Sequence, residues 1–164
     1  MRITGKAWKF GDDIDTDQII PAKYLTISDP VEISKHCFQY KRDNFASLVT
    51  EGDLIIAGNN FGCGSSREEA PFILKEIGIR AVIAKSFARI FFRNAINIGL
   101  PVIEAERIVD ETSEGDILNL NLINGQIKNA SKNLDYTITP VPEFLQQLIN
   151  QGGLVNFVKR ELGK

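Results

Sequence analysis

The most informative stretch of the sequence is a glycine-bearing loop that ends in two hydroxyls and a guanidinium. Gly62-Cys63-Gly64 is followed directly by Ser65, Ser66 and Arg67. An arginine can hold a carboxylate through two parallel hydrogen bonds, and a serine hydroxyl can both donate and accept beside it. These residue types at this spacing indicate a site for a carboxylate or a phosphate with a hydroxyl next to it.

The elements on either side of this loop would place it at the start of a helix. Residues 53–58 contain an unbroken apolar run after Asp53, which predicts a buried strand. Ser65-Ser66-Arg67-Glu68 fits a capping box, and apolar residues then recur at helical spacing as far as Gly78. Free N–H groups and the dipole at a helix N-terminus attract anions. The alternative is that a serine only caps the helix and Arg67 lies in solvent.

Three better-known loop patterns do not fit. Arg67 stands where the third glycine of a dinucleotide-binding loop would be. Gly64 precedes Ser65, whereas a Walker loop has lysine there, and neither serine has a glycine two residues later, as a nucleophile elbow requires. The loop therefore belongs to none of these classes.

Strand and helix signals alternate along the rest of the chain. This pattern predicts a single α/β domain over residues 1–164, with a mixed sheet that includes an antiparallel portion. Asn124-Gly125 between alternating runs predicts a hairpin. The expected strands are 3–10, 53–58, 80–85, 101–104, 117–122 and 136–139, and the expected helices are 29–40, 65–78, 87–98, 142–149 and 154–162.

Composition excludes several classes of function. The 164 residues are 43% hydrophobic and 24% charged, as in globular proteins, and the net charge is −2. That charge argues against a nucleic acid or an anionic membrane as the main partner. No apolar run is long enough to span a bilayer, and residues 1–6 lack the apolar core of a signal peptide, so we expect a cytoplasmic protein.

Cysteine and histidine are too scarce for a metal centre built by this chain alone. The sequence has Cys37 and Cys63 and a single histidine, His36. A four-ligand Cys/His site cannot be made from three residues of which two are adjacent, and a disulfide framework is likewise excluded. We expect no metal site on this chain.

Three segments in order carry a resemblance to a known family. They are Asp15-Thr16-Asp17-Gln18-Ile19-Ile20-Pro21, Gly62-Cys63-Gly64-Ser65-Ser66-Arg67-Glu68 and Lys85-Ser86-Phe87-Ala88-Arg89-Ile90. Together they resemble the small subunits of 3-isopropylmalate dehydratase, in the aconitase superfamily, over nearly the whole chain. The length suits the short, archaeal-type small subunit. The resemblance implies a swivelling β/β/α domain with a mixed sheet, similar to the aconitase C-terminal domain.

The resemblance also implies an activity and residue roles. Family members are hydro-lyases that move a hydroxyl between adjacent carbons of a malate-like acid by dehydration and rehydration. Ser65 matches the serine that acts as base, and Asp17 matches an active-site acid that supports proton handling. Ser66 and Arg67 match residues that bind the substrate carboxylate.

A partner protein follows from the same resemblance. In the family a 4Fe–4S cluster, held by three cysteines, takes up the leaving hydroxide as a Lewis acid. Because this chain has only two cysteines, the cluster must lie on a large subunit. The chain would then be active only as part of a heteromer.

Substrate choice in the family is attributed to the loop Tyr24-Leu25-Thr26-Ile27. Homoaconitase-like members carry arginine where this chain has Thr26, so the loop offers no charge to a third carboxylate. We therefore expect isopropylmalate as substrate, in leucine biosynthesis. The alternatives are a 2,3-dimethylmalate, methylmalate/citraconate or homoaconitate type of hydro-lyase, or a non-catalytic anion-binding module.

Overall fold

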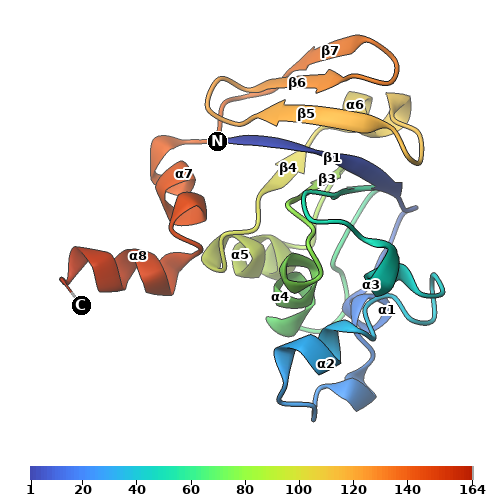
Figure 1. Cartoon of the computed structure of the whole chain (residues 1–164), viewed down its shortest axis with the longest axis vertical. Helices are drawn as coiled ribbons and strands as arrows, with labels where there is room; N and C mark the ends of the chain where they lie inside the picture. Colours follow the sequence, from blue (N-terminus) through green and yellow to red (C-terminus); the bar gives the residue numbers. More distant parts are fainter. Residues whose placement is uncertain (164) are drawn as a thin grey trace.

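One seven-stranded sheet organises the computed structural model, which describes residues 1–163 (Figure 1). The strand order is β4-β3-β2-β1-β5-β6-β7. β1 to β4 are parallel, whereas β5, β6 and β7 continue the sheet antiparallel from β1. The strands are β1 (Arg2–Lys9), β2 (Leu54–Ala57), β3 (Ala81–Ala84), β4 (Val102–Glu104), β5 (Ile117–Asn121), β6 (Gln126–Asn129) and β7 (Leu134–Thr137). The predicted mixed-sheet α/β fold is confirmed.

Helices connect the parallel strands and extend beyond the sheet at the C-terminal end. They are α1 (Thr16–Ile19), the 3₁₀ turn η1 (Ala22–Tyr24), α2 (Pro30–Ser34), α3 (Phe45–Leu48), α4 (Glu69–Glu76), α5 (Arg89–Asn97), α6 (Glu106–Glu111), α7 (Glu143–Asn150) and α8 (Leu154–Glu161). In Figure 1, α7 and α8 lie to one side of the sheet, and α8 points away from it. Within residues 1–163, no helix has the length and apolar character needed to cross a membrane.

The parallel half of the sheet is buried on both faces, which explains its unbroken apolar runs. All four residues of β2 and of β3 are buried. On one face Ile55 and Val82 join a core with α4, α5 and a group of phenylalanines. On the other face Leu54 and Ile83 pack with residues of α6 and of β5 to β7. The sheet therefore curls, so that its antiparallel strands cover one face of its parallel strands.

The antiparallel half shows the alternation expected of a sheet with one wet face. β5 alternates between buried leucines and half-exposed asparagines, and β6 follows the same period. The predicted hairpin is present, but Asn121 pairs with Gln126, so its loop has four residues rather than two. β7 begins two residues earlier than expected, at Leu134.

Two predicted helices differ from the structure. The helix expected over residues 29–40 ends at Ser34, although Asp29 caps it and Pro30 opens it as predicted. The chain leaves the helix because Phe38 takes a left-handed backbone and packs, fully buried, against Phe10 and Phe45. A buried aromatic contact outweighs the continuation of a short helix.

The second difference concerns the loop singled out above. The prediction of a capping box at Ser65 and Ser66 was wrong. The helix α4 begins only at Glu69, and the side chain of Glu68 makes no capping hydrogen bond. The two serines lie in the loop before the helix, and Ser65 contacts another segment instead. The predicted end of the helix is confirmed, since Gly78 follows its last residues.

Candidate active site

Three chain segments that follow β1, β2 and β3 lie side by side at the carboxyl edge of the parallel strands. The Gly62 N–H donates to the carbonyl of Ile14 at 2.7 Å, and the Phe61 N–H donates to the carbonyl of Ser86 at 3.0 Å. Isolated bridges join Asp15 to Cys63 and Phe61 to Phe87. This is the edge at which open α/β sheets bind ligands. The three segments quoted above for the family resemblance are therefore neighbours in space.

Two of the predicted site residues form an ion pair between these segments. Arg67 Nη1 donates to Asp17 Oδ1 at 2.7 Å and to the carbonyl of Ile20 at 3.1 Å. The Arg67 side chain is only 13% exposed, whereas that of Asp17 is 60% exposed. This hydrogen bond lowers the pKa of Asp17, so its carboxyl is ionised at neutral pH. The Asp17 carboxylate and the Ile20 carbonyl thus hold the Arg67 guanidinium in one orientation.

The serines lie at the exposed tip of the same loop. Ser65 and Ser66 are both exposed. The Oγ atom of Ser65 lies 3.3 Å from Thr16 Oγ1, and Thr16 Oγ1 donates to the Ser65 carbonyl at 3.1 Å. Ser65 and Arg67 are therefore contacted by two adjacent residues of α1, Thr16 and Asp17, a connection that the sequence did not indicate.

The two glycines of the loop allow it to lie close against its support. Both have positive φ, +78° at Gly62 and +91° at Gly64. A Cβ atom on Gly62 would lie 2.2 Å from the Phe91 ring, which no side chain could tolerate, and one on Gly64 would lie 3.3 Å from Thr16 Oγ1. The loop thus needs glycine for both its conformation and its close approach.

The predicted substrate loop lies next to this site but packs mainly on the protein. The Tyr24 ring stacks on His36 with ring centres 3.7 Å apart. Leu25 and Ile27 are half-buried against the core, while Thr26 is exposed. The Ala22 N–H donates to Asp17 Oδ1 at 3.3 Å and links the two regions. Thr26 is therefore the member of the loop best placed to meet a ligand.

Acidic and amide side chains from the segments after β1 and β2 hold the loop through hydrogen bonds. Asp12 Oδ1 accepts from the Asn59 N–H at 2.6 Å, and Asp13 Oδ1 accepts from Asn60 Nδ2 at 2.8 Å. Ser86 Oγ accepts from the Asn60 N–H at 2.8 Å. These polar residues could have been identified from the sequence by their position, because they lie directly after the predicted strands that became β1, β2 and β3.

The two cysteines and the two arginines of α5 are the remaining candidate residues. Cys37 is buried, and burial raises the pKa of its thiol. Burial, together with the charges of Asp15 and Asp13, also raises the pKa of Cys63, so its sulfur stays protonated at neutral pH. Arg89 and Arg93 are exposed and line a groove between α5, β4 and α7.

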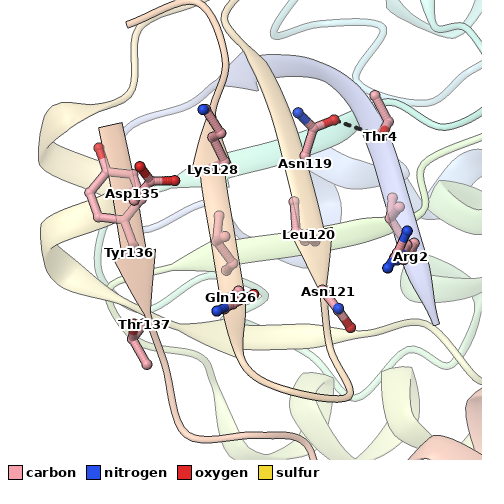
Figure 2. Close-up of a pocket in the computed structure, with 12 residues that line it drawn as sticks. Arg2, Thr4, Asn119, Leu120, Asn121, Gln126, Lys128, Asp135, Tyr136 and Thr137 are labelled. Carbon is pink, nitrogen blue, oxygen red and sulfur yellow. Dashed lines mark hydrogen bonds between the residues drawn. The ribbon is translucent and has the colours of Figure 1, made fainter. Parts of the chain in front are cut away.

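A separate hollow lies on the wet face of the antiparallel strands (Figure 2). Its wall presents polar side chains from four strands, and the Thr4 hydroxyl donates to Asn119 Oδ1 at 2.8 Å. None of the predicted site residues lines it. Among residues 1–163, no group of three or more His, Cys, Asp and Glu side chains could hold a metal ion.

Comparisons with known proteins agree on one family. Residues 43–107 match the model of the aconitase C-terminal domain. A 3-isopropylmalate dehydratase small subunit of Thermodesulfovibrio yellowstonii is 57% identical over 162 residues, which is 99% of this chain and 96% of that protein. The small subunit 1 of Archaeoglobus fulgidus is 56% identical over 155 residues, 94% of this chain and 96% of its own length. The crystal structure of a 3-isopropylmalate dehydratase from Methanocaldococcus jannaschii superposes with a TM-score of 0.92 at 49% identity and covers 99% of this chain and 96% of that one.

Proposed function

Because this chain belongs to the family of 3-isopropylmalate dehydratase small subunits, we propose that it completes the active site of that hydro-lyase. The reaction interconverts 2- and 3-isopropylmalate by removing water across two neighbouring carbons and adding it back with the opposite orientation. The observation that carries the proposal is the exposed Ser65–Ser66 pair beside the Arg67–Asp17 ion pair at the carboxyl edge of the sheet.

The reaction needs a base at one carbon and a leaving hydroxide at the next. A base takes the proton beside a carboxylate, the electrons of that C–H bond form the double bond, and hydroxide departs with the electrons of the C–O bond. In this proposal Ser65 takes the proton as an alkoxide and returns it when water adds back. A serine hydroxyl is weakly acidic, so a nearby positive charge must favour its ionised form.

Arg67 supplies that charge and also a grip on the substrate. Because α4 begins at Glu69, the helix dipole acts from further away than the sequence predicted, so in this proposal the positive charge comes from the Arg67 guanidinium, two residues along the chain from Ser65. Within residues 1–163, Nε and Nη2 of Arg67 form no hydrogen bond, and Nη1 is used by Asp17. We assign these donors, with the Ser66 hydroxyl, to a substrate carboxylate.

Asp17 acts in this proposal from its ionised form. Its carboxylate orients Arg67 and offers an exposed oxygen that supports proton handling at the same edge of the sheet. The departing hydroxide still needs a Lewis acid. With two cysteines, one of them buried, this chain cannot hold a 4Fe–4S cluster. We assign the cluster to a large subunit that covers this edge.

The substrate loop favours an apolar group over a third carboxylate. Thr26 is exposed and uncharged, and its neighbours Leu25 and Ile27 are apolar. A buried carboxylate without a cation is costly, whereas apolar burial contributes about 0.8 kcal/mol per CH₂-sized group, and an isopropyl group offers such surface. Isopropylmalate is therefore the expected substrate.

Reconstitution tests the proposal. The purified chain should carry no iron and no activity, and addition of a cluster-bearing large subunit should produce turnover of isopropylmalate in preference to homoaconitate. Thr26→Arg should shift the ratio of kcat/KM toward the tricarboxylic acid, while Thr50→Arg, at an exposed position by α3, should leave the ratio unchanged. Stoichiometric iron on the isolated chain, or tight binding of malate-type acids without a partner and no turnover with one, would contradict the proposal.

A further inference from the structure

Thr16 is a buried residue whose backbone is fixed on both sides. It is the first residue of α1 and is only 2% exposed. Its N–H donates to the carbonyl of Cys63 at 2.9 Å, and its own carbonyl accepts from the Ile20 N–H at 2.9 Å. The Thr16 side chain therefore has a fixed origin directly beneath the loop that ends in Ser65.

The Thr16 hydroxyl reaches both oxygens of Ser65. Thr16 Oγ1 donates to the Ser65 carbonyl at 3.1 Å and lies 3.3 Å from Ser65 Oγ. A hydroxyl has one proton to donate and two lone pairs that accept. While Ser65 is neutral, its own proton can therefore point to Thr16 Oγ1, which fixes the serine side chain in one orientation.

The same geometry has a second use once Ser65 loses its proton. The ionised oxygen can no longer donate, but it accepts strongly, and a hydrogen bond to an ionised group is roughly twice as strong as a neutral one. A small rotation of the Thr16 hydroxyl would turn its proton from the Ser65 carbonyl oxygen to the ionised Ser65 Oγ. No side chain has to move for this exchange.

We propose that Thr16 is the positioning residue of the base, aligning the neutral Ser65 hydroxyl and donating a hydrogen bond to its ionised form. The inference rests on the proposed role of Ser65. It adds a buried hydroxyl as a second stabilising group besides the Arg67 guanidinium, which donates to Asp17.

The test uses the reconstituted enzyme and compares side chains at position 16 that carry a hydroxyl with side chains of similar size that lack it. Thr16→Val replaces the hydroxyl by a methyl group at equal volume, and Thr16→Ser keeps the hydroxyl but removes the methyl. Thr16→Val should lower kcat about 10- to 100-fold, the scale of one hydrogen bond to a charged group, with KM unchanged. Thr16→Ser should stay within a few-fold of wild type.

The matched control is Thr112→Val. Thr112 is also a threonine that is 2% exposed, and its hydroxyl has no hydrogen-bond partner within the described chain. This variant should leave kcat and KM unchanged. If Thr16→Val does not fold, Thr16→Ala and Thr16→Ser make the same comparison, because they too differ only in the hydroxyl.

Three results would overturn the inference: wild-type kcat in Thr16→Val, equal damage in the serine variant and in the variant that lacks the hydroxyl, or a change confined to KM. Ser65→Ala separates this inference from the proposal beneath it. If the Ser65→Ala enzyme is active, Ser65 is not the base, and the proposed role of Ser65 fails. If Ser65→Ala is inactive but Thr16→Val is fully active, the proposed role of Ser65 stands and only the role of Thr16 is refuted.

Discussion

The two halves of the sheet use polar residues in different ways. At the carboxyl edge of the parallel strands, polar side chains join segments far apart in the sequence, such as Arg67 and Asp17, 50 positions apart. In the antiparallel half, Asn129 is completely buried and donates to the buried carboxylate of Asp116. The first arrangement leaves the Asp17 carboxylate and the two serines exposed, whereas the second is buried inside the fold. We therefore expect polar substitutions in one half to affect turnover and in the other to affect stability.

The largest expected effect is that of Ser65→Ala in the reconstituted enzyme. Removal of the proposed base should lower kcat by about 10³-fold or more, with little change in the melting temperature because Ser65 is exposed. The matched control is Ser131→Ala, an exposed serine of the antiparallel half that accepts from the Ile117 N–H. It should retain wild-type kcat. A Ser65→Ala enzyme that keeps a tenth of wild-type turnover would remove Ser65 from the role of base.

Arg67→Lys should act on substrate binding. Lysine keeps the charge but loses the planar fork, so KM should rise about 30- to 150-fold, equivalent to roughly 2–3 kcal/mol. Arg107→Lys is the counterpart in the other half, where Arg107 Nε donates to Glu111 at 2.9 Å, and it should leave KM unchanged. Equal kinetic constants for Arg67→Lys and wild type would show that Arg67 does not hold the carboxylate.

Asn129→Ala should reverse the pattern. The substitution removes the hydrogen bond from Asn129 Nδ2 to Asp116 at 2.7 Å and leaves a buried carboxylate short of a donor. We expect the free energy of unfolding to fall by about 1–3 kcal/mol, measured by urea denaturation, with kcat unchanged. Asn124→Ala, on the exposed hairpin loop, is the control and should change neither quantity. A fall in kcat at unchanged stability would break the distinction between the halves.

The smallest expected effect is that of Asp17→Asn on stability at low pH. Its hydrogen bond from Arg67 lowers the pKa of Asp17 below its ordinary value of 3.8, so its contribution is present above that value and is lost as the pH falls through the folded pKa. Because Asp17 is largely exposed, we expect less than about 1 kcal/mol. Unfolding free energies of wild type and Asp17→Asn should converge below pH 3.8. A difference that grows toward acid pH would contradict this assignment.

The parallel half was the more predictable part of the fold. The apolar runs within residues 53–58 and 80–85 predicted buried strands because both faces of β2 and β3 are covered. Gly78 and Gly99 marked the ends of α4 and α5. By contrast, α6 was missed, since only Ile108 and Val109 of its residues are buried and they give no helical period.

The sequence indicated which residues form the candidate site but not the contacts that they make. The sequence placed Ser65 at a helix cap because Ser-x-x-Glu is a local signal. In the structure its hydroxyl lies beside Thr16, 49 positions away, and no local pattern reports such a contact. The brace formed by Asp13 and Asn60 was missed for the same reason.

The position of β1 in the middle of the sheet has a consequence for the order in which the chain can fold. Its parallel partner β2 and the rest of the parallel half are complete by Glu104, so the edge that carries Ser65 and Arg67 can form before β5 is available. The Thr4–Asn119 contact, by contrast, spans 115 positions and cannot form until residue 119 has left the ribosome. Until then β1 has an unpaired edge, and the apolar face that β5 to β7 will cover is open to other chains. Aggregation during synthesis is therefore expected to depend on how quickly residues 117–137 arrive, and not on the loops that we propose bind the substrate.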